Sequence, residues 1–294
     1  MTQRRDWLKL VALAPCALST RMTARGQDIP FKSDSTIANR THELKLGVVT
    51  YSVRDLKVDA IIAAMKQLEV ESVSPYRLHL PIEIGSAEEC RTVAQKFRDA
   101  GIDLAGTGVV ELRNNESSMR RAFDNAVAAN LSLITIRPQP DCLPLLDRLV
   151  KEFNVKVAIH NHGPEDKLYP DPEVTWQTIR HLDPRIGICI DFGHAARAGA
   201  DPIASIRRCR DRLYDFHLKD SVALPRAPKD NPVEIGRGRL DIRAALAALM
   251  EIDYRYQVGV EYDRQGVDLV TGLAESVGYV RGMLTAMSVQ QQSG

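Results

Sequence analysis

From Leu44 onward, short apolar runs alternate along the chain with longer segments in which apolar and polar positions are mixed. The runs are rich in β-branched residues and mostly apolar on both faces, which is typical of strands buried in a parallel sheet. The pattern therefore predicts eight strands, at residues 46–50, 70–73, 104–110, 133–136, 155–159, 186–190, 213–216 and 258–260.

The mixed segments between these runs have the spacing of amphipathic helices. Ile61 and Met65 share one helical face, and Ser86 with Glu89 forms a capping box at the start of the next helix. Gly101 stands where a glycine commonly follows a helix end. Eight strands alternating with seven or eight helices predict an α/β fold, a (β/α)8 TIM barrel in a single domain. Because no GxGxxG or phosphate-binding loop follows the first strand, an open nucleotide-binding sheet is less favoured.

Composition narrows the classes of partner. The 294 residues include 39 basic and 38 acidic side chains, for a formal net charge of +1. Such a balance gives no general attraction to nucleic acid or anionic lipid, so a small molecule is the expected partner. The five cysteines are scattered, which indicates neither a zinc ribbon nor a disulfide framework. Assembly of several copies of the chain is left open.

The first residues have the pattern of an export signal. Arg4 and Arg5 precede Trp7 and a short apolar stretch at 10–18, as in twin-arginine signals. The stretch is too short to span a bilayer. We therefore expect a leader and linker at residues 1–39, a barrel domain at 40–294, and a periplasmic protein that is not held in the membrane once the signal is removed. The alternative is a basic leader without an export role.

Four successive predicted strands end in an ionisable residue, namely His160, Asp191, His217 and Glu261. In a barrel of parallel strands these ends form the catalytic face, and neighbouring strands lie about 4.8 Å apart. A single such residue is more often a cap or a loop hydrogen-bonder. Because the feature recurs at four consecutive strands, the sequence predicts that the four side chains converge on one ion.

The chemistry of the four side chains narrows the choice of metal. Two imidazoles and two carboxylates suit Mn²⁺, Zn²⁺, Co²⁺ or Fe²⁺ better than Ca²⁺, which prefers oxygen ligands throughout, and Mg²⁺ is also less favoured. Such an ion would leave positions open for substrate oxygens and would act as a Lewis acid.

Five segments together have a recognisable pattern: Leu46-Gly47-Val48-Val49-Thr50-Tyr51-Ser52, Asp191-Phe192-Gly193-His194, Phe216-His217-Leu218-Lys219-Asp220, Gly236-Arg237-Gly238 and Val260-Glu261-Tyr262. With them, the chain from Leu46 to about Leu284 resembles the xylose isomerase-like TIM barrels. This is the sugar phosphate isomerase/epimerase superfamily, which also contains endonuclease IV. The resemblance implies metal ligands at Asp191, His217 and Glu261, and a substrate contact at His194.

The chain departs from that family at His160, where a metal-binding glutamate that doubles as a base is usual. A metal-bound imidazole has both nitrogens committed and makes a poor base. With a histidine at this position, the chain resembles relatives that act on 3-keto sugars by β-elimination or hydration more than it resembles epimerases with two opposed carboxylates. The candidate bases are Glu261, His79, Glu111 and Lys219, and the candidate substrate-binding residues are His194, His162, Arg137 and Tyr51.

The leading hypothesis is thus a divalent-metal-dependent enzyme that abstracts a proton next to the carbonyl of a sugar or keto-sugar, as an isomerase, epimerase, lyase or hydratase. One alternative is DNA repair of the endonuclease IV type, which requires further ligands for three zinc ions. The balanced charge argues against it, because binding of duplex DNA favours an excess of basic residues. The other is an inactive periplasmic sugar-binding barrel, which would be favoured if the four proposed ligands lay too far apart to share an ion.

Overall fold

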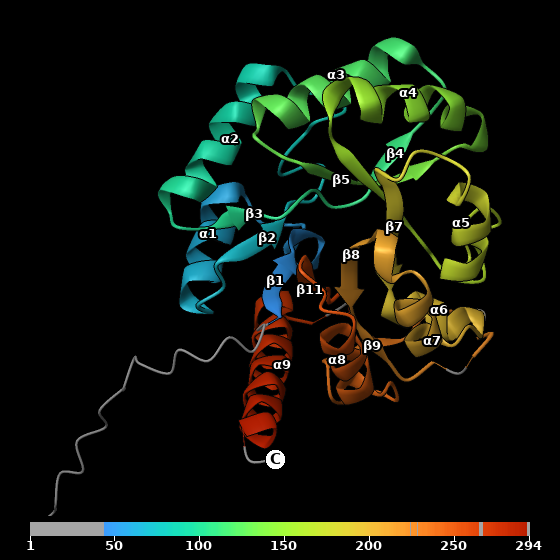
Figure 1. The fold of residues 1–294 in the computed structure, drawn as a ribbon. Helices are drawn as coiled ribbons and strands as arrows, with labels where there is room; N and C mark the ends of the chain where they lie inside the picture. The colour runs from blue at the N-terminus through green and yellow to red at the C-terminus, as the bar shows by residue number, and fades with distance from the viewer. Residues whose placement is uncertain (1–43, 224, 228, 265–266, 293–294) are drawn as a thin grey trace, which may run out of the picture. The chain divides into compact units, whose positions relative to one another are not determined.

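A computed structural model describes residues 44–223, 225–227, 229–264 and 267–292 (Figure 1). They all belong to one compact unit, Thr41–Gly294. The leader and linker predicted at residues 1–39 lie outside the described residues, so the prediction for them stays a prediction. No helix in the described part of the chain is both long and apolar enough to cross a bilayer.

Nine parallel strands form one sheet, in the order β3-β2-β1-β11-β8-β7-β6-β5-β4, and the predicted α/β barrel is confirmed. The strands are β1 (Lys45–Val49), β2 (Ser72–Ser74), β3 (Asp103–Leu104), β4 (Val110–Leu112), β5 (Leu133–Pro138), β6 (Lys156–His160), β7 (Ile186–Asp191), β8 (Leu213–Leu218) and β11 (Gln257–Val260). A separate antiparallel pair joins β9 (Asp220–Ser221) to β10 (Pro232–Val233).

The sheet closes through the segment between its two edge strands, β3 and β4. The amide of Gly108 donates a hydrogen bond to the carbonyl of Pro75 on the β2 side (2.7 Å), and that of Thr135 on β5 donates to Oγ1 of Thr107 (3.1 Å). At Gly108 a Cβ would lie 3.1 Å from Cα of Tyr76, so the close approach requires glycine. The prediction of one continuous strand at 104–110 is therefore wrong, because this glycine-containing stretch divides it in two.

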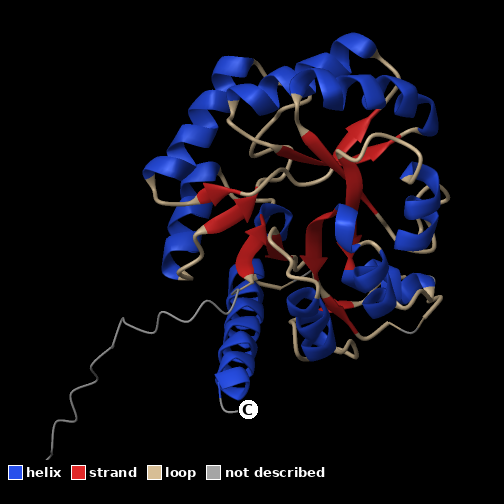
Figure 2. Cartoon of the chain, in the orientation of Figure 1, coloured by secondary structure: helices blue, strands red, loops and turns tan. Residues whose placement is uncertain are grey.

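Helices cover the outside of the sheet (Figure 2). They are α1 (Val58–Gln67), α2 (Ala87–Asp99), α3 (Glu116–Ala128), α4 (Leu143–Phe153), α5 (Pro172–Ile179), α6 (Phe192–Ala198), α7 (Pro202–Arg208), α8 (Ile242–Glu251) and α9 (Leu269–Gln292), with 3-10 turns η1 (Thr50–Val53), η2 (Pro140–Cys142) and η3 (Arg210–Arg212). The capping box at Ser86 and Glu89 is confirmed at the start of α2. Gly101 follows α2 with a φ of 77°, which glycine adopts without a steric penalty.

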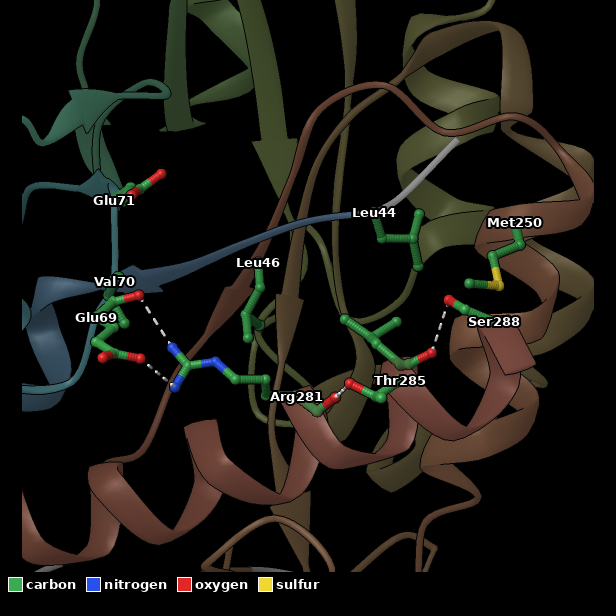
Figure 3. A pocket seen from close by; sticks show the side chains of 10 residues that line it. Leu44, Leu46, Glu69, Val70, Glu71, Met250, Arg281, Thr285 and Ser288 are labelled. Carbon is green, nitrogen blue, oxygen red and sulfur yellow. Dashed lines mark hydrogen bonds and ion pairs between the residues drawn. The ribbon is translucent and has the colours of Figure 1, made fainter. Parts of the chain in front are cut away.

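A hollow of about 380 Å³ lies at the N-terminal end of β1, beside α9 (Figure 3). Its lining includes Leu46 and Arg281, whose Nη2 donates hydrogen bonds to the carbonyls of Leu68 (2.8 Å) and Glu69 (3.0 Å). These contacts tie α9 to the turn before β2. The N-terminal end of a barrel serves stability rather than catalysis. We therefore expect the catalytic site at the C-terminal ends of the strands.

Candidate metal centre

The four predicted ligands meet at the C-terminal ends of adjacent strands. His160 and Asp191 are the last residues of β6 and β7, His217 lies near the end of β8, and Glu261 directly follows β11. Asp191 pairs in register with His217, which pairs with Gly259 on the next strand. One nitrogen or oxygen atom from each of the four lies within 4.8 Å of the others. None of the four residues is more than 7% exposed.

The closest approaches define which atoms face one another. Nδ1 of His217 lies 2.8 Å from Oε2 of Glu261, and Nε2 of His160 lies 3.4 Å from Oδ2 of Asp191. The other carboxylate oxygen of Asp191, Oδ1, accepts a hydrogen bond from the amide of His194 (2.8 Å) and so caps α6. Asp191 is thereby held in place by one oxygen and offers the other to the cluster.

The buried nitrogen and oxygen atoms of the cluster are suited to a divalent ion. Nε2 of His160 and Nδ1 of His217 are buried and make no hydrogen bond, and Oδ2 of Asp191 is buried with an ion pair to Lys219 at 3.1 Å but no hydrogen bond. A buried polar atom without a hydrogen-bond partner is costly, so several of them converging on one point indicate a missing electrophile. Nitrogen and carboxylate oxygen atoms are the ligands that Zn²⁺ and similar ions take.

Electrostatics hold three of the four ligands in the forms that bind metal. Burial lowers the pKa of His160 well below its usual value, so the ring is neutral. Burial alone would raise the pKa of Asp191 and of Glu261, but neighbouring groups bring each pKa below its usual value: His194 and then Lys219 at Asp191, and Lys219 at Glu261. Both carboxyl groups are therefore ionised, as metal binding requires.

His217 is the exception among the four ligands. Burial alone would lower its pKa, but Cys189 and Asp215 raise it well above its usual value. A metal ion would therefore have to displace a proton there.

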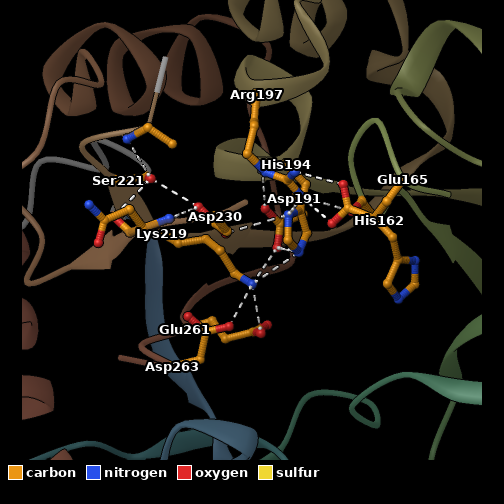
Figure 4. Close-up of polar contacts among 12 residues, drawn as sticks. His162, Glu165, Asp191, His194, Arg197, Lys219, Ser221, Asp230, Glu261 and Asp263 are labelled. Carbon is orange, nitrogen blue, oxygen red and sulfur yellow. Dashed lines mark hydrogen bonds and ion pairs between the residues drawn. The ribbon is translucent and has the colours of Figure 1, made fainter. Parts of the chain in front are cut away.

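Lys219 directly follows β8, and its side chain extends into the cluster (Figure 4). Its Nζ lies 2.9 Å from Oε1 of Glu261, 3.1 Å from Oδ2 of Asp191 and 3.7 Å from Oδ2 of Asp263. Burial by itself would lower the pKa of Lys219, but these carboxylates raise it well above the usual value. The side chain is thus a buried ammonium group. A Cβ at Gly193 would lie 3.1 Å from Cγ of Lys219, so the start of α6 leaves room for its stem.

A cavity of about 240 Å³ opens above the cluster. One side of it is apolar and aromatic, with Tyr51 in η1 and Tyr76 in edge-to-face contact at 5.1 Å between ring centroids. The remaining lining residues are Val49, Val109, His160, His162, His194, His217, Lys219, Glu261 and Asp263. The predicted substrate-binding residues Tyr51, His162 and His194 therefore all line the cavity.

Besides the buried ligand Asp191, three predicted site residues do not line this cavity. His79 is buried behind Tyr76, and its Nδ1 is 2.6 Å from Oγ1 of Thr50. Arg137 donates two hydrogen bonds to Asp166 (2.6 and 2.9 Å) and others to the exposed Glu111. Its guanidinium group is thus occupied in holding the loop after β6.

The structure adds three aspartates that the sequence analysis did not select. Asp263 lines the cavity, and its buried Oδ1 has no hydrogen-bond partner. Oδ2 of Asp230 lies 3.7 Å from Nδ1 of His194, and Oδ2 of Asp215 lies 3.2 Å from Nε2 of His217. Asp215 could have been predicted from the sequence, because residues two apart on a strand point to the same side, and Asp263 could have been noticed from its place just after Glu261. Asp215 and Asp263 each stand two residues from a predicted ligand.

Asp220 explains two of the segments on which the family resemblance rests. Its Oδ2 accepts hydrogen bonds from the amides of Gly236 (3.0 Å) and Gly238 (2.9 Å). Gly236 has a φ of 95°, and a Cβ at Gly238 would overlap the Asp220 carboxylate. The aspartate after Lys219 and the Gly-Arg-Gly loop therefore form one structural unit beside the site.

Comparison with known proteins places this fold. Residues 141–283 match the sequence model of the family described as xylose isomerase-like TIM barrel. No curated protein gives a significant sequence match.

Three solved structures show the same fold. The IOLI protein with a binding zinc atom has 15% identity and a TM-score of 0.69, over 83% of this chain and 99% of that chain. The 3-keto-D-glucoside 4-epimerase YcjR from E. coli has 14% identity and a TM-score of 0.66, over 82% and 100%. D-psicose 3-epimerase in the presence of D-fructose has 15% identity and a TM-score of 0.65, over 82% and 99%. Residues 141–283 are thus similar in sequence to the xylose isomerase-like TIM barrel family, and the solved structures show that the chain shares the barrel fold.

Proposed function

We propose that this barrel is a divalent-metal-dependent enzyme that removes a proton from the carbon next to the carbonyl group of a sugar or keto-sugar. The observation that carries the proposal is the buried cluster of four ligand-type side chains at the floor of the cavity, all with ligand atoms within 4.8 Å of one another. The similar folds named as epimerases of D-psicose and of a 3-keto-D-glucoside support this class of substrate.

His160, Asp191, His217 and Glu261 would hold the ion, and a bound divalent ion there would polarise the substrate carbonyl as a Lewis acid. Lys219 supplies a second electrophile. Its protonated Nζ stands beside two of the ligands and donates a hydrogen bond to a substrate oxygen on which negative charge develops.

Asp263 is the proton acceptor in this proposal. It is the carboxylate that lines the cavity outside the four-ligand set, and its Oδ1 makes no hydrogen bond. The other candidate bases are less suited, since Glu261 and Lys219 contact each other at 2.9 Å, while His79 and Glu111 do not line the cavity.

His160 favours elimination or hydration over epimerisation. Epimerisation with two bases needs a second free acceptor opposite the first, and this position in β6 carries a buried imidazole instead of a carboxylate. The finer proposal is thus a lyase or hydratase acting on a 3-keto-glycoside, whose α-proton is acidified by the neighbouring carbonyl.

Isotope exchange tests the proposal. Metal-loaded protein is incubated in D₂O with free ketoses and with 3-keto-glycosides, and the products are followed by NMR. Deuterium at the carbon next to the carbonyl, with loss of the aglycone or hydration, supports the lyase or hydratase branch. Deuterium uptake with inversion and without elimination supports an epimerase, and a complete lack of exchange across the panel contradicts proton abstraction.

The role of Asp263 is tested by a matched pair of variants. We expect Asp263→Asn to lower the exchange rate by about 10²-fold or more, the usual contribution of a general base, while the protein still binds its metal. The control, Glu111→Gln, removes a carboxylate that does not line the cavity. This variant should exchange substrate hydrogen for deuterium at the wild-type rate. Equal rates for Asp263→Asn and wild type would exclude Asp263 as the base.

The two alternative functions receive no separate support. An inactive barrel was favoured only if the four side chains lay too far apart to share an ion, and they do not. A three-zinc centre needs additional ligands. Within the described residues, the one other metal-type group, with Cys189, uses His160 and His217 again.

A further inference from the structure

Asp215 is a buried carboxylate one layer beneath the proposed metal cluster. It is 2% exposed and lies two residues before His217 on β8, so both side chains point into the barrel. Oγ1 of Thr135 donates a hydrogen bond to its Oδ2 (2.5 Å), and the amide of Phe216 donates to its Oδ1 (2.9 Å). No ion pair between Asp215 and a lysine or arginine occurs among the described residues. A buried carboxylate with only two hydrogen bonds and no lysine or arginine paired with it lowers the stability of the fold. A further hydrogen-bond donor would therefore stabilise it.

The ring of His217 is the nearest such donor. It lies between two carboxylates, with Nδ1 2.8 Å from Oε2 of Glu261 and Nε2 3.2 Å from Oδ2 of Asp215. Neither ring nitrogen meets the full geometry of a hydrogen bond, but the 3.2 Å between Nε2 and Oδ2 of Asp215 is within hydrogen-bonding distance. The thiol of Cys189 is also near this ring, but a thiol is a weak acceptor.

The geometry decides which nitrogen is free for an ion. Nδ1 faces Glu261 and the rest of the cluster, whereas Nε2 faces Asp215 in the barrel interior. A neutral imidazole that gives Nδ1 to a metal carries its proton on Nε2. The Nε2–H then points at the buried carboxylate of Asp215.

We propose that Asp215 is a positioning residue for the metal: it accepts the Nε2–H of His217, fixes the ring tautomer that presents Nδ1 to the ion, and strengthens that nitrogen as a ligand. This inference rests on the proposed metal function. His160 has no such anion behind it, because its Nδ1 lies 3.3 Å from Nδ1 of His162, another imidazole. His217 is thus the more firmly oriented of the two histidine ligands.

The test compares Asp215→Asn with Thr135→Val, which removes the other side-chain hydrogen bond to the same carboxylate. Affinity for Zn²⁺ is measured by competition with a chelator, and the ligand field is measured from the visible absorption of the Co²⁺ form. We expect Asp215→Asn to weaken Zn²⁺ binding about 10- to 100-fold and to shift the Co²⁺ bands. Thr135→Val should lower the melting temperature yet leave the affinity within about threefold and the bands unchanged.

Two outcomes overturn the inference: wild-type affinity in Asp215→Asn, or an equal loss in Thr135→Val, which would make Asp215 a structural tie between β5 and β8. A wild-type protein that binds no Zn²⁺ would instead overturn the metal function itself. A measurement on the unmutated protein remains decisive if Asp215→Asn fails to fold. In the Zn²⁺ form, imidazole ¹⁵N NMR should show His217 protonated at Nε2, and protonation at Nδ1 would contradict the proposal.

Discussion

At the scale of single residues, Lys219 sets the charge of the site. Its ammonium group touches two of the four proposed ligands and is 3% exposed, so it is a permanent part of the cluster. Two charges of the same sign repel each other strongly at such short range away from water. In the proposed metal enzyme, Lys219 would therefore oppose the divalent ion while it neutralises Asp191 and Glu261, and it would promote the reaction at the expense of metal affinity.

This balance gives a prediction for Lys219→Met. Because the substitution keeps the length of the stem and removes the charge, we expect metal to bind several-fold more tightly. The exchange rate should fall about 10²-fold, because an electrophile at the developing negative charge is lost. Chelator competition and isotope exchange measure the two effects. Weaker metal binding together with an unchanged rate would show that Lys219 has neither role.

At the scale of elements, the loop between β6 and α5 is held by one buried carboxylate. Asp166, 6% exposed, accepts the two hydrogen bonds from Arg137 on β5 and one from the amide of Leu168 (2.8 Å). Its Oδ2 also lies 3.5 Å from Nδ1 of His162 in the cavity wall. Burial alone would raise the pKa of Asp166, but Arg137 and the backbone amide lower it below its usual value.

We expect Asp166→Asn to lower the free energy of unfolding by about 2 kcal/mol, the contribution of a hydrogen bond to a charged group. The direction in which this stabilisation changes with pH follows from the lowered pKa of Asp166. The ionised carboxylate stabilises the protein above its unfolded pKa of about 3.9, and this contribution is lost as pH falls through the folded value. Denaturation from pH 7 to pH 3 should therefore show the wild-type advantage shrinking below about pH 4. An advantage that grows in acid would contradict this account.

The strands and their ends were largely predictable from the sequence, whereas the loops were not. A short apolar run that stops at His160 or Asp191 predicts a strand, and the alternation of side chains along a strand predicts the direction of its last residue. The broken strand around Gly108 depends on a close approach to Tyr76, which is distant in sequence. Arg137 lies on β5 and its partner Asp166 lies in the loop between β6 and α5, and no local sequence pattern reveals such a pairing.

At the scale of the whole chain, the described barrel separates two ends with different tasks. The end beside α9 is held by hydrogen bonds from the Arg281 side chain to two backbone carbonyls, and the opposite end carries the charged cluster. For the leader at residues 1–39, we propose export by the twin-arginine route, which carries folded proteins and would allow metal to be loaded first. A reporter fused to this leader should reach the periplasm only by that route. Its retention in the cell, or passage through the general secretory route, would contradict the proposal.

The central claim is that four strand-end residues bind one divalent ion. Elemental analysis of the purified barrel after loading with Zn²⁺ or Mn²⁺ and removal of free metal tests it most directly, with the Asp191→Ala/His217→Ala double variant measured in parallel and its fold checked by circular dichroism. We predict close to one ion per chain for the wild type and none for the folded double variant. A full complement of metal in that variant would contradict the account.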